Sequence, residues 1–370
     1  MQKRILLMHI CTVSGHKEAN VAIERAINMV DSDALVKSIN VFDYTGPKTA
    51  NLINKMYLGT IKHFPYLWGF LYDNQNIIDN TKNIKQAIYT RNYKKIHSLI
   101  EEFRPSVIVA TQAFPFGLCA EYKRHFANGF KLVGVMTDHA PHAYWFEDGV
   151  DYYVVPSEEI RNNLILRGIE KDKVKVFGIP IDPKFGNKLI KQKIFSDTKI
   201  DEKLPIVLIM GGGQGLGPIK KIIKSLNNIK LDFQIILVCG TNKKLEAQIK
   251  KKVKFYKKKV IVYGFMKNID ELMSISKLII TKAGGLTTSE ALAKCLPLVI
   301  IKPIPGQEKH NADYLVSKNV AIHVKRINGI KKAVTTLLKN PEQLKEMQKN
   351  TLEISKPNSS LDIAKLLLSL

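Results

Sequence analysis

The sequence predicts an α/β protein with two domains, each built on a parallel β-sheet. Two observations indicate this: short apolar runs alternate with amphipathic helical stretches, and the alternation occurs in two separate blocks of the 370-residue chain. Between the blocks, from Pro180 to Leu204, the periodicity is lost in a Lys-rich stretch. The predicted segments are a first domain at 1–182, a linker at 183–204, a second domain at 205–345 and further C-terminal helices at 346–370.

The first block alternates strands and helices in the order typical of a parallel sheet that is covered on both faces. Helices are predicted at Lys17–Val30 and Tyr93–Phe103. The predicted strands are Lys3–Ile10, Ala34–Val41, Val107–Ala110, Leu132–Met136, Tyr152–Val155 and Val174–Phe177.

The second block repeats this organisation from Pro205 onward. Its predicted strands are Ile206–Met210, Phe233–Cys239, Val260–Tyr263, Leu278–Thr281 and Leu298–Ile301. Helices are predicted at Pro218–Leu226 and Leu245–Lys254. A further helix is predicted to begin after a cap formed by Thr287-Thr288, and more helices are predicted within 327–370. Ligands of open parallel sheets bind at the carboxyl ends of the strands and at domain interfaces, so we expect the site there.

The net charge of +24 allows three interpretations: a nucleic-acid partner, an anionic membrane surface, or a Lys-biased solvated surface. Only eight of the 57 basic residues are arginine. Base recognition favours the planar arginine fork, whereas lysine acts as a point charge on a diffuse negative surface. We therefore expect no nucleic-acid partner and keep the membrane and the plain solvated surface as alternatives.

The longest apolar runs are about six residues, far below the roughly 20 that a membrane-spanning helix needs. Four cysteines are scattered without CxxC spacing, which favours reduced thiols over disulfides or a zinc site. We expect a cytoplasmic protein that binds peripherally to the inner face of the cell membrane.

A long aromatic insertion, Asn54–Tyr72, interrupts the first block and contains Tyr66 and Trp68. Aromatic rings with flanking lysines suit a membrane interface, and long connections in compact domains are often functional. We predict that this segment contacts the membrane and the acceptor. The alternative is that its rings pack as an ordinary core helix or lid.

Two glycine-rich turns follow predicted strands of the second block. Gly212, Gly213 and Gly215 follow its first strand, and Gly284-Gly285 precede a helix. Such turns let the backbone approach a ligand and present N–H groups to an anion. The first turn lacks the Lys-Ser/Thr of a P-loop. Together they predict two sets of donors for one diphosphate.

The stretch from Gly264 to Asn311 resembles the nucleotide-binding half of GT-B glycosyltransferases. The resemblance rests on Gly-Gly-Leu-Thr followed by Glu290, and on Pro-Gly-Gln-Glu followed by Asn311. It is specific to monogalactosyldiacylglycerol synthases, processive diacylglycerol glucosyltransferases and, more distantly, the lipid II N-acetylglucosaminyltransferase. It extends over most of the chain and implies two Rossmann-like domains that face a central cleft, with one C-terminal helix crossing back to the first domain.

The same resemblance implies the residues that bind the nucleotide sugar. Phe265 and Met266 match the segment whose backbone holds the uracil ring, and Glu290 matches the acid that binds the ribose, although Thr287 and Glu290 also fit a capping box. The matching positions that complete the predicted donor site are Gly212, Gly213, Gly215, Gly284, Gly285, Leu286, Thr287, Gln307, Glu308 and Asn311. A solvated turn that enters a helix is the alternative for the last three.

His16 follows the first predicted strand, where its ring could remove the acceptor proton, and the resemblance implies that role. The alternative is that His16 caps the following helix. The family also has a Thr-Asp pair followed by a His and a Trp, and the matching residues here are Thr137-Asp138, His142 and Trp145. By this match, Asp138 is predicted to orient His16 or to share its role as the base. Gly15, His142 and Trp145 are predicted to line the acceptor site. The second block, which carries the predicted donor site, contains no Asp-x-Asp that would hold a metal on a diphosphate, so we expect no metal or other cofactor.

The resemblance, together with these residues, implies an inverting transferase that moves a hexose from a UDP-sugar to the 3-hydroxyl of diacylglycerol. Its expected partners are the UDP-sugar donor, diacylglycerol and an anionic membrane surface. Two alternatives remain: transfer of N-acetylglucosamine to a polyprenyl-linked acceptor, and a UDP-sugar epimerase of the same architecture.

Overall fold

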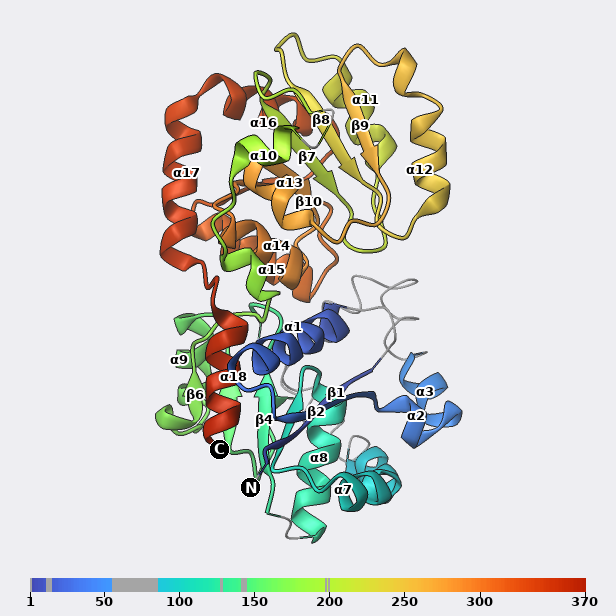
Figure 1. Cartoon of the computed structure of the whole chain (residues 1–370), viewed down its shortest axis with the longest axis vertical. Coiled ribbons are helices and arrows are strands. Elements are labelled where there is room, and N and C mark those ends of the chain that lie inside the picture. Colours follow the sequence, from blue (N-terminus) through green and yellow to red (C-terminus); the bar gives the residue numbers. More distant parts are fainter. Residues whose placement is uncertain are drawn as a thin grey trace. The chain divides into compact units, whose positions relative to one another are not determined.

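The computed structural model describes residues 2–10, 15–54, 86–126, 129–140, 145–196, 198 and 200–370. The chain forms two compact units (Figure 1). The first contains Met1–Pro183, Ile304–Gln307 and Asn358–Leu370, and the second contains Lys184–Pro303 and Glu308–Pro357. Residues 184–204 therefore belong to the second unit, and they include the helix α10 (Lys191–Ser196).

The first unit is built on a six-stranded parallel sheet with the order β2-β1-β3-β4-β5-β6. Its strands are β1 (Arg4–His9), β2 (Leu35–Asn40), β3 (Val107–Ala110), β4 (Lys131–Val135), β5 (Tyr152–Val154) and β6 (Val174–Lys175). In β1, Leu6 and Met8 belong to one hydrophobic core and Ile5 and Leu7 to another. The strand is apolar at successive positions because both faces of the sheet are covered.

Helices cover both faces of this sheet. They are α1 (Gly15–Val30), α2 (Phe42–Thr45), α3 (Pro47–Asn54), α7 (His97–Phe103), α8 (Ala113–Phe126), α9 (Glu158–Leu166) and α18 (Ser359–Ser369), with 3₁₀ turns η2 (Tyr93–Ile96) and η4 (Lys171–Lys173). A further 3₁₀ turn, η5 (Pro183–Gly186), begins at the last residue of the Met1–Pro183 segment and continues into the second unit. Residues of α7 and α8 pack on the face of Leu6, and residues of α1 and α18 on the face of Ile5.

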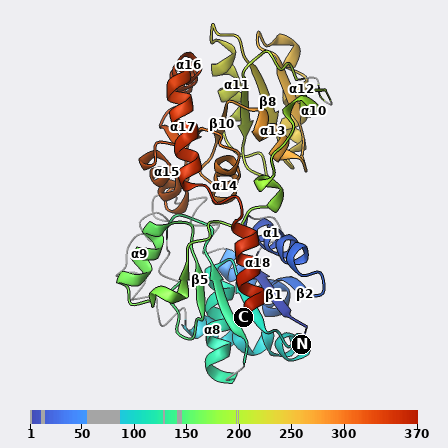
Figure 2. The ribbon, with the colours of Figure 1, turned by 60° about the vertical axis from the view of Figure 1, so that its left-hand side comes forward.

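The C-terminal helix α18 belongs to the first unit and lies beside α1 (Figure 2). Two serines at its start fix it to the backbone of Ile181. Ser360 Oγ donates to the Ile181 carbonyl at 2.6 Å, and the Ile181 amide donates to Ser359 Oγ at 3.3 Å. Ile363, Ala364 and Leu367 then complete the core over β1. The last helix is thus a structural part of the N-terminal sheet.

The second unit also has six parallel strands, in the order β12-β11-β10-β7-β8-β9. They are β7 (Ile206–Met210), β8 (Gln234–Val238), β9 (Val260–Tyr263), β10 (Leu278–Thr281), β11 (Leu298–Ile301) and β12 (Ala321–Val324). The pairing places Ile209 opposite Ile280 and Leu237, so the strand ends form one edge of the sheet.

The remaining helices of the second unit are α11 (Ile219–Asn227), α12 (Lys243–Lys250), α13 (Ile269–Ile275), α14 (Gly285–Ala293), α15 (Gln307–Ser317), α16 (Asn328–Lys339) and α17 (Pro341–Ile354), with η6 (Val253–Phe255). Buried side chains of α11, α12 and α16 share a core with Val207, Ile235 and Leu278 of the sheet. The α/β prediction of two parallel sheets is confirmed. Within the described residues, the helices are all too short or too polar to cross a bilayer.

Candidate active site

His16 lies in the first turn of α1, at the carboxyl edge of the first sheet. Its Nδ1 is 3.0 Å from Oγ1 of Thr137, which follows β4. Oγ1 of Thr111, which follows β3, donates to the His16 carbonyl at 3.3 Å. Both threonines are buried. Two neighbouring strand ends therefore hold the backbone and the ring of His16, and the fold fixes where this imidazole can reach.

Burial lowers the pKa of His16 from 6.5 to about 4, although a hydrogen bond to the Thr111 backbone opposes the shift and the nearby His9 adds to it. A neutral imidazole has a lone pair that can accept a proton, whereas the imidazolium does not. The His16 ring is thus neutral at physiological pH.

A second histidine lies at the end of β1. His9 is 4% exposed, and its Nδ1 is 3.3 Å from Nδ2 of Asn20 on α1. Burial and the charge of Lys17 lower the pKa of His9, while Asp43 opposes them. The contact between His9 and Asn20 therefore joins the end of β1 to α1, next to His16.

The other predicted residues of the acceptor side have different surroundings. Asp138 directly follows Thr137 and is partly buried at the same strand end, and Gly15 is the exposed first residue of α1. Trp145 is only 7% exposed, because its ring packs on Phe116 in the core with the centroids 5.1 Å apart. His142, Tyr66 and Trp68 lie outside the described residues.

In the second unit, the glycine-rich turn after β7 is tightly fixed. The Gly215 amide donates to the Gly212 carbonyl at 3.0 Å, and the Thr241 amide donates to the Gly213 carbonyl at 2.9 Å. Asn242 donates from Nδ2 to the Gly215 carbonyl at 3.3 Å while its Oδ1 caps α12. The loop after β8 thus holds the loop after β7.

Glycine is needed in this turn for two separate reasons. Gly215 has a φ of +58°, and a Cβ there would lie 2.1 Å from the Cys239 carbonyl oxygen. A Cβ at Gly213 would meet no atom within 4 Å. One glycine therefore packs against backbone, and the other borders open space that a ligand can occupy.

The turn after β10 begins α14 earlier than the sequence suggested. Gly284 is the N-cap and Gly285 the first helical residue, so Thr287 lies inside the first turn and forms no capping box with Glu290. The predicted Thr287-Thr288 cap is wrong. Oγ1 of the buried Thr288 donates instead to the Gly284 and Gly285 carbonyls, at 2.9 and 3.0 Å. A Cβ at Gly284 would meet no atom within 4 Å, so this helix start offers backbone N–H groups beside open space.

The start of α15 is joined to this turn by two contacts. Nζ of Lys282 lies 2.8 Å from Oε1 of Glu308, with side chains 22% and 10% exposed. Nδ2 of Asn311 donates to the Ala283 carbonyl at 2.9 Å, and Asn311 is fully buried. The four residues fix the β10–α14 turn from the side of β11.

The remaining predicted donor residues lie along the same edge. Phe265 follows β9 and is 65% exposed, with Met266 beside it. Gly264 packs against Glu246, where a Cβ would lie 2.6 Å from a carboxylate oxygen. Leu286 and Glu290 lie on α14, and Gln307 is the first residue of α15. The segments that follow β7, β9, β10 and β11 in the chain thus contain every residue of the predicted donor set, and Gln307 is the one of them that is assigned to the first unit.

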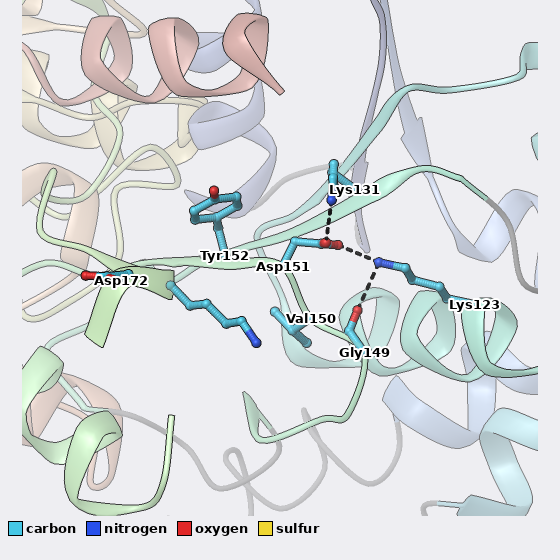
Figure 3. Close-up of a pocket in the computed structure, with 8 residues that line it drawn as sticks. Lys123, Lys131, Gly149, Val150, Asp151, Tyr152 and Asp172 are labelled. Carbon is cyan, nitrogen blue, oxygen red and sulfur yellow. Dashed lines mark hydrogen bonds and ion pairs between the residues drawn. The ribbon is translucent and has the colours of Figure 1, made fainter. Parts of the chain in front are cut away.

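A hollow of about 440 Å³ lies on the opposite, amino edge of the first sheet (Figure 3). Asp151 accepts there from Lys131 at 3.2 Å and from Lys123, and it also accepts from the Leu132 amide at 2.8 Å. Those lysines and that amide hold the pKa of Asp151 below its usual value against the effect of burial. The lysines are thus engaged, and the hollow is a structural charge cluster away from His16.

Thr111, Thr137 and Lys282 were not among the predicted site residues. Each lies within two residues of the carboxyl end of a strand, which is the available sequence signal, but threonine and lysine are common at such positions. In the described part of the chain, no group of three or more His, Cys, Asp or Glu side chains is placed to hold a metal ion.

Two family models match the chain. The monogalactosyldiacylglycerol (MGDG) synthase model matches residues 16–181, and the model of the glycosyltransferase family 28 C-terminal domain matches residues 206–367. A processive diacylglycerol beta-glucosyltransferase of Staphylococcus epidermidis is 30% identical, over 100% of this chain and 93% of the relative. Monogalactosyldiacylglycerol synthase 3 of Arabidopsis thaliana is also 30% identical, over 98% of this chain and 80% of the relative.

Solved structures agree on the fold. The chain matches Acinetobacter baumannii MurG with a TM-score of 0.64 at 14% identity, over 100% of both chains. It matches the UDP-GlcNAc 2-epimerase of Neisseria meningitidis with a TM-score of 0.62 at 16% identity, also over 100% of both. With two six-stranded parallel sheets, matches to both family models and near full-length similarity to these relatives, the chain belongs to the GT-B glycosyltransferase family of monogalactosyldiacylglycerol synthases and processive diacylglycerol glucosyltransferases.

Proposed function

We propose that the protein transfers a hexose from a UDP-sugar to the 3-hydroxyl of 1,2-diacylglycerol and forms a β-glycosyl diacylglycerol with inversion. The observation that supports this most is the neutral, partly buried imidazole of His16 at a strand edge, in a chain similar to diacylglycerol glycosyltransferases. Such a base can take the hydroxyl proton while the acceptor oxygen attacks the anomeric carbon.

The leaving group is UDP, and negative charge grows on its diphosphate as the glycosidic bond breaks. Backbone N–H groups at the start of α14 and in the glycine-rich turn after β7 are the donors proposed to stabilise that charge. This role requires no metal ion, and we propose a reaction without one.

The other predicted residues receive roles in binding. Glu290 is proposed to bind the ribose, and the backbone at Phe265 and Met266 to bind the uracil. Glu308 and Gln307 are proposed to bind sugar hydroxyls. Because Asn311 is fully buried and holds the Ala283 carbonyl, its proposed contribution is to fix the phosphate-binding turn.

On the acceptor side, Asp138 is proposed to orient His16 or share the proton. Gly15, His142 and Trp145, with Tyr66 and Trp68 of the insertion, are proposed to line the path of the lipid. The acceptor lies in a bilayer, so we also propose peripheral binding to an anionic membrane at the inner face of the cell membrane.

Product analysis tests this proposal. Purified protein is incubated with labelled UDP-glucose, UDP-galactose or UDP-N-acetylglucosamine and with vesicles that contain either dioleoylglycerol or a polyprenyl diphosphate sugar. We expect a labelled glycosyl diacylglycerol with one of the hexose donors, and the coupling constant of its anomeric proton should indicate the β configuration. Label only in the polyprenyl lipid, or epimerised UDP-sugar without a lipid product, would contradict it.

A further inference from the structure

A strongly basic turn lies between α12 and β9. It consists of the last residue of α12 and the residues up to β9, 250–259, of which seven are lysine: Lys250, Lys251, Lys252, Lys254, Lys257, Lys258 and Lys259. No Asp or Glu occurs between Glu246 and Asp270. Because α12 ends and β9 begins here, the basic turn lies at the amino edge of the second sheet, opposite the edge with the glycine-rich turns.

The basic turn is an ordered surface of the second unit. Oδ1 of Asn227 accepts from the amides of Lys257 and Lys258, at 2.6 and 3.2 Å. The Tyr256 amide donates to the Val253 carbonyl at 3.1 Å, and both of these side chains pack partly buried against the core. These contacts fix which side chains of the turn face solvent.

Phe255 is the apolar residue of the turn that points outward. Its side chain is 73% exposed between the anchored Val253 and Tyr256, and Nζ of Lys254 lies 5.2 Å from the centroid of its ring. A phenylalanine held in water forgoes the free energy of burial. A single exposed apolar residue is ordinary, but this one lies within a run of exposed lysines.

Several of the lysines have no acidic partner in the described part of the chain. Lys250 pairs with Glu246 at 2.6 Å, and Nζ of Lys258 donates to the Leu231 carbonyl. The exposed lysines for which the described residues provide no ion pair are Lys251, Lys252, Lys254, Lys257 and Lys259. The positive charge of this surface is therefore not neutralised locally.

We propose that the basic turn binds the surface of an anionic lipid bilayer, with the Phe255 ring at the depth of the headgroups. Aromatic rings favour that interface, and each lysine gains from the negative potential of the bilayer. The turn contains lysines but no arginine, and lysine suits a diffuse charged surface better than the hydrogen-bonding edges of nucleic-acid bases. A lipid surface is therefore favoured over nucleic acid as the partner. The turn belongs to the second unit and lies at the edge of its sheet opposite the glycine-rich turns. This contact rests on the membrane binding proposed above, and a vesicle assay without donor or acceptor tests it apart from the transfer reaction.

Vesicle sedimentation without donor or acceptor tests the charge. The full chain is mixed with vesicles of phosphatidylcholine alone or of equimolar phosphatidylcholine and phosphatidylglycerol. Changing Lys251, Lys254 and Lys257 to Glu should weaken binding to the anionic vesicles about tenfold or more. The matched control changes the exposed Lys331, Lys332 and Lys345 of α16 and α17 to Glu, with the same change in net charge. Equal losses in both variants would overturn the proposal, because net charge alone would then explain binding.

Two further measurements test the aromatic residue and the class of partner. Phe255→Trp should show a blue-shifted emission with anionic vesicles, and Phe255→Ala should weaken binding while the thermal unfolding midpoint is unchanged. Emission that stays at the aqueous wavelength would overturn the proposal. So would a result in which the triple variant loses binding to single-stranded RNA but retains vesicle binding.

Discussion

Oγ1 of Thr137 lies 3.0 Å from Nδ1 of His16, although the two residues are 121 positions apart in the chain. The contact joins the end of β4 to the first turn of α1. It constrains the orientation of the imidazole ring. The catalytic role proposed for His16 therefore depends on a residue of another strand.

Thr137→Val tests this dependence, because valine keeps the shape and removes the hydroxyl. We expect kcat to fall by less than the ~10²–10⁴-fold that a general base contributes, with KM for the donor unchanged. Thr137→Ser should restore most of the rate, since it restores the hydroxyl. An unchanged kcat in the valine variant would show that the contact does not position the base.

The pH dependence follows from the lowered pKa of His16, which is about 4 against an ordinary 6.5. The base stays neutral as the pH falls through 6.5, so the acidic limb of kcat/KM should lie near pH 4. Between these values the unfolded chain binds more protons than the native one, so the free energy of unfolding should decrease as the pH is lowered from 6.5. The pH profile of kcat/KM measures the acidic limb, and urea titrations at each pH measure the free energy of unfolding. An acidic limb near pH 6.5 would contradict the role of His16 as a base with a lowered pKa.

The Lys282–Glu308 pair is expected to support the donor site as a unit. Glu308→Gln leaves the partly buried Lys282 ammonium without its counter-charge, so we expect a loss of about 1–3 kcal/mol in the free energy of unfolding. Lys282→Met together with Glu308→Gln should recover part of that loss. Urea unfolding of the single and double variants measures the coupling, and additive losses would show that the pair is not coupled.

The two kinds of glycine in the turn after β7 can be separated by paired substitutions. Gly215→Ala forces a Cβ against the Cys239 carbonyl at a φ of +58°, so we expect destabilisation by about 1–3 kcal/mol or more and weaker UDP binding. Gly213→Ala adds its Cβ in open space and should leave folding stability nearly unchanged. Thermal unfolding and UDP titration distinguish them. Equal effects on stability would contradict the packing described here.

The strands were the most predictable part of the fold. β3, β7, β9, β10 and β11 begin and end at the predicted residues. Parallel strands that are buried on both faces are short apolar runs between turn residues, and this pattern is visible in the sequence.

The helix α8 (Ala113–Phe126) was not indicated by the sequence pattern. It is buried over most of its surface, from Pro115 to Tyr122, so its apolar residues do not form a stripe of helical period. The β12 strand was also not indicated, because its four residues include His323 and give little apolar signal.

Site residues that belong to a local sequence motif could be predicted. Site residues whose position depends on contacts between distant parts of the chain could not. The glycine turns follow their strands as predicted, but the helix starts at Gly285, which removes the predicted cap at Thr287 and Thr288. The contacts of Thr137 with His16 and of Lys282 with Glu308 join separate strand ends. No sequence period encodes such contacts, since they depend on how the strands are ordered in the sheet.

The most direct test of the central claim is the lipid product formed from a labelled UDP-hexose and dioleoylglycerol vesicles by the wild-type chain and by His16→Ala. The account predicts a glycosyl diacylglycerol with the wild type, and a rate lower by ~10²–10⁴-fold in the variant with UDP binding retained. A variant that forms the glycolipid at the wild-type rate would contradict the role of His16. A wild-type chain that converts UDP-hexose without any lipid product would contradict the transfer itself.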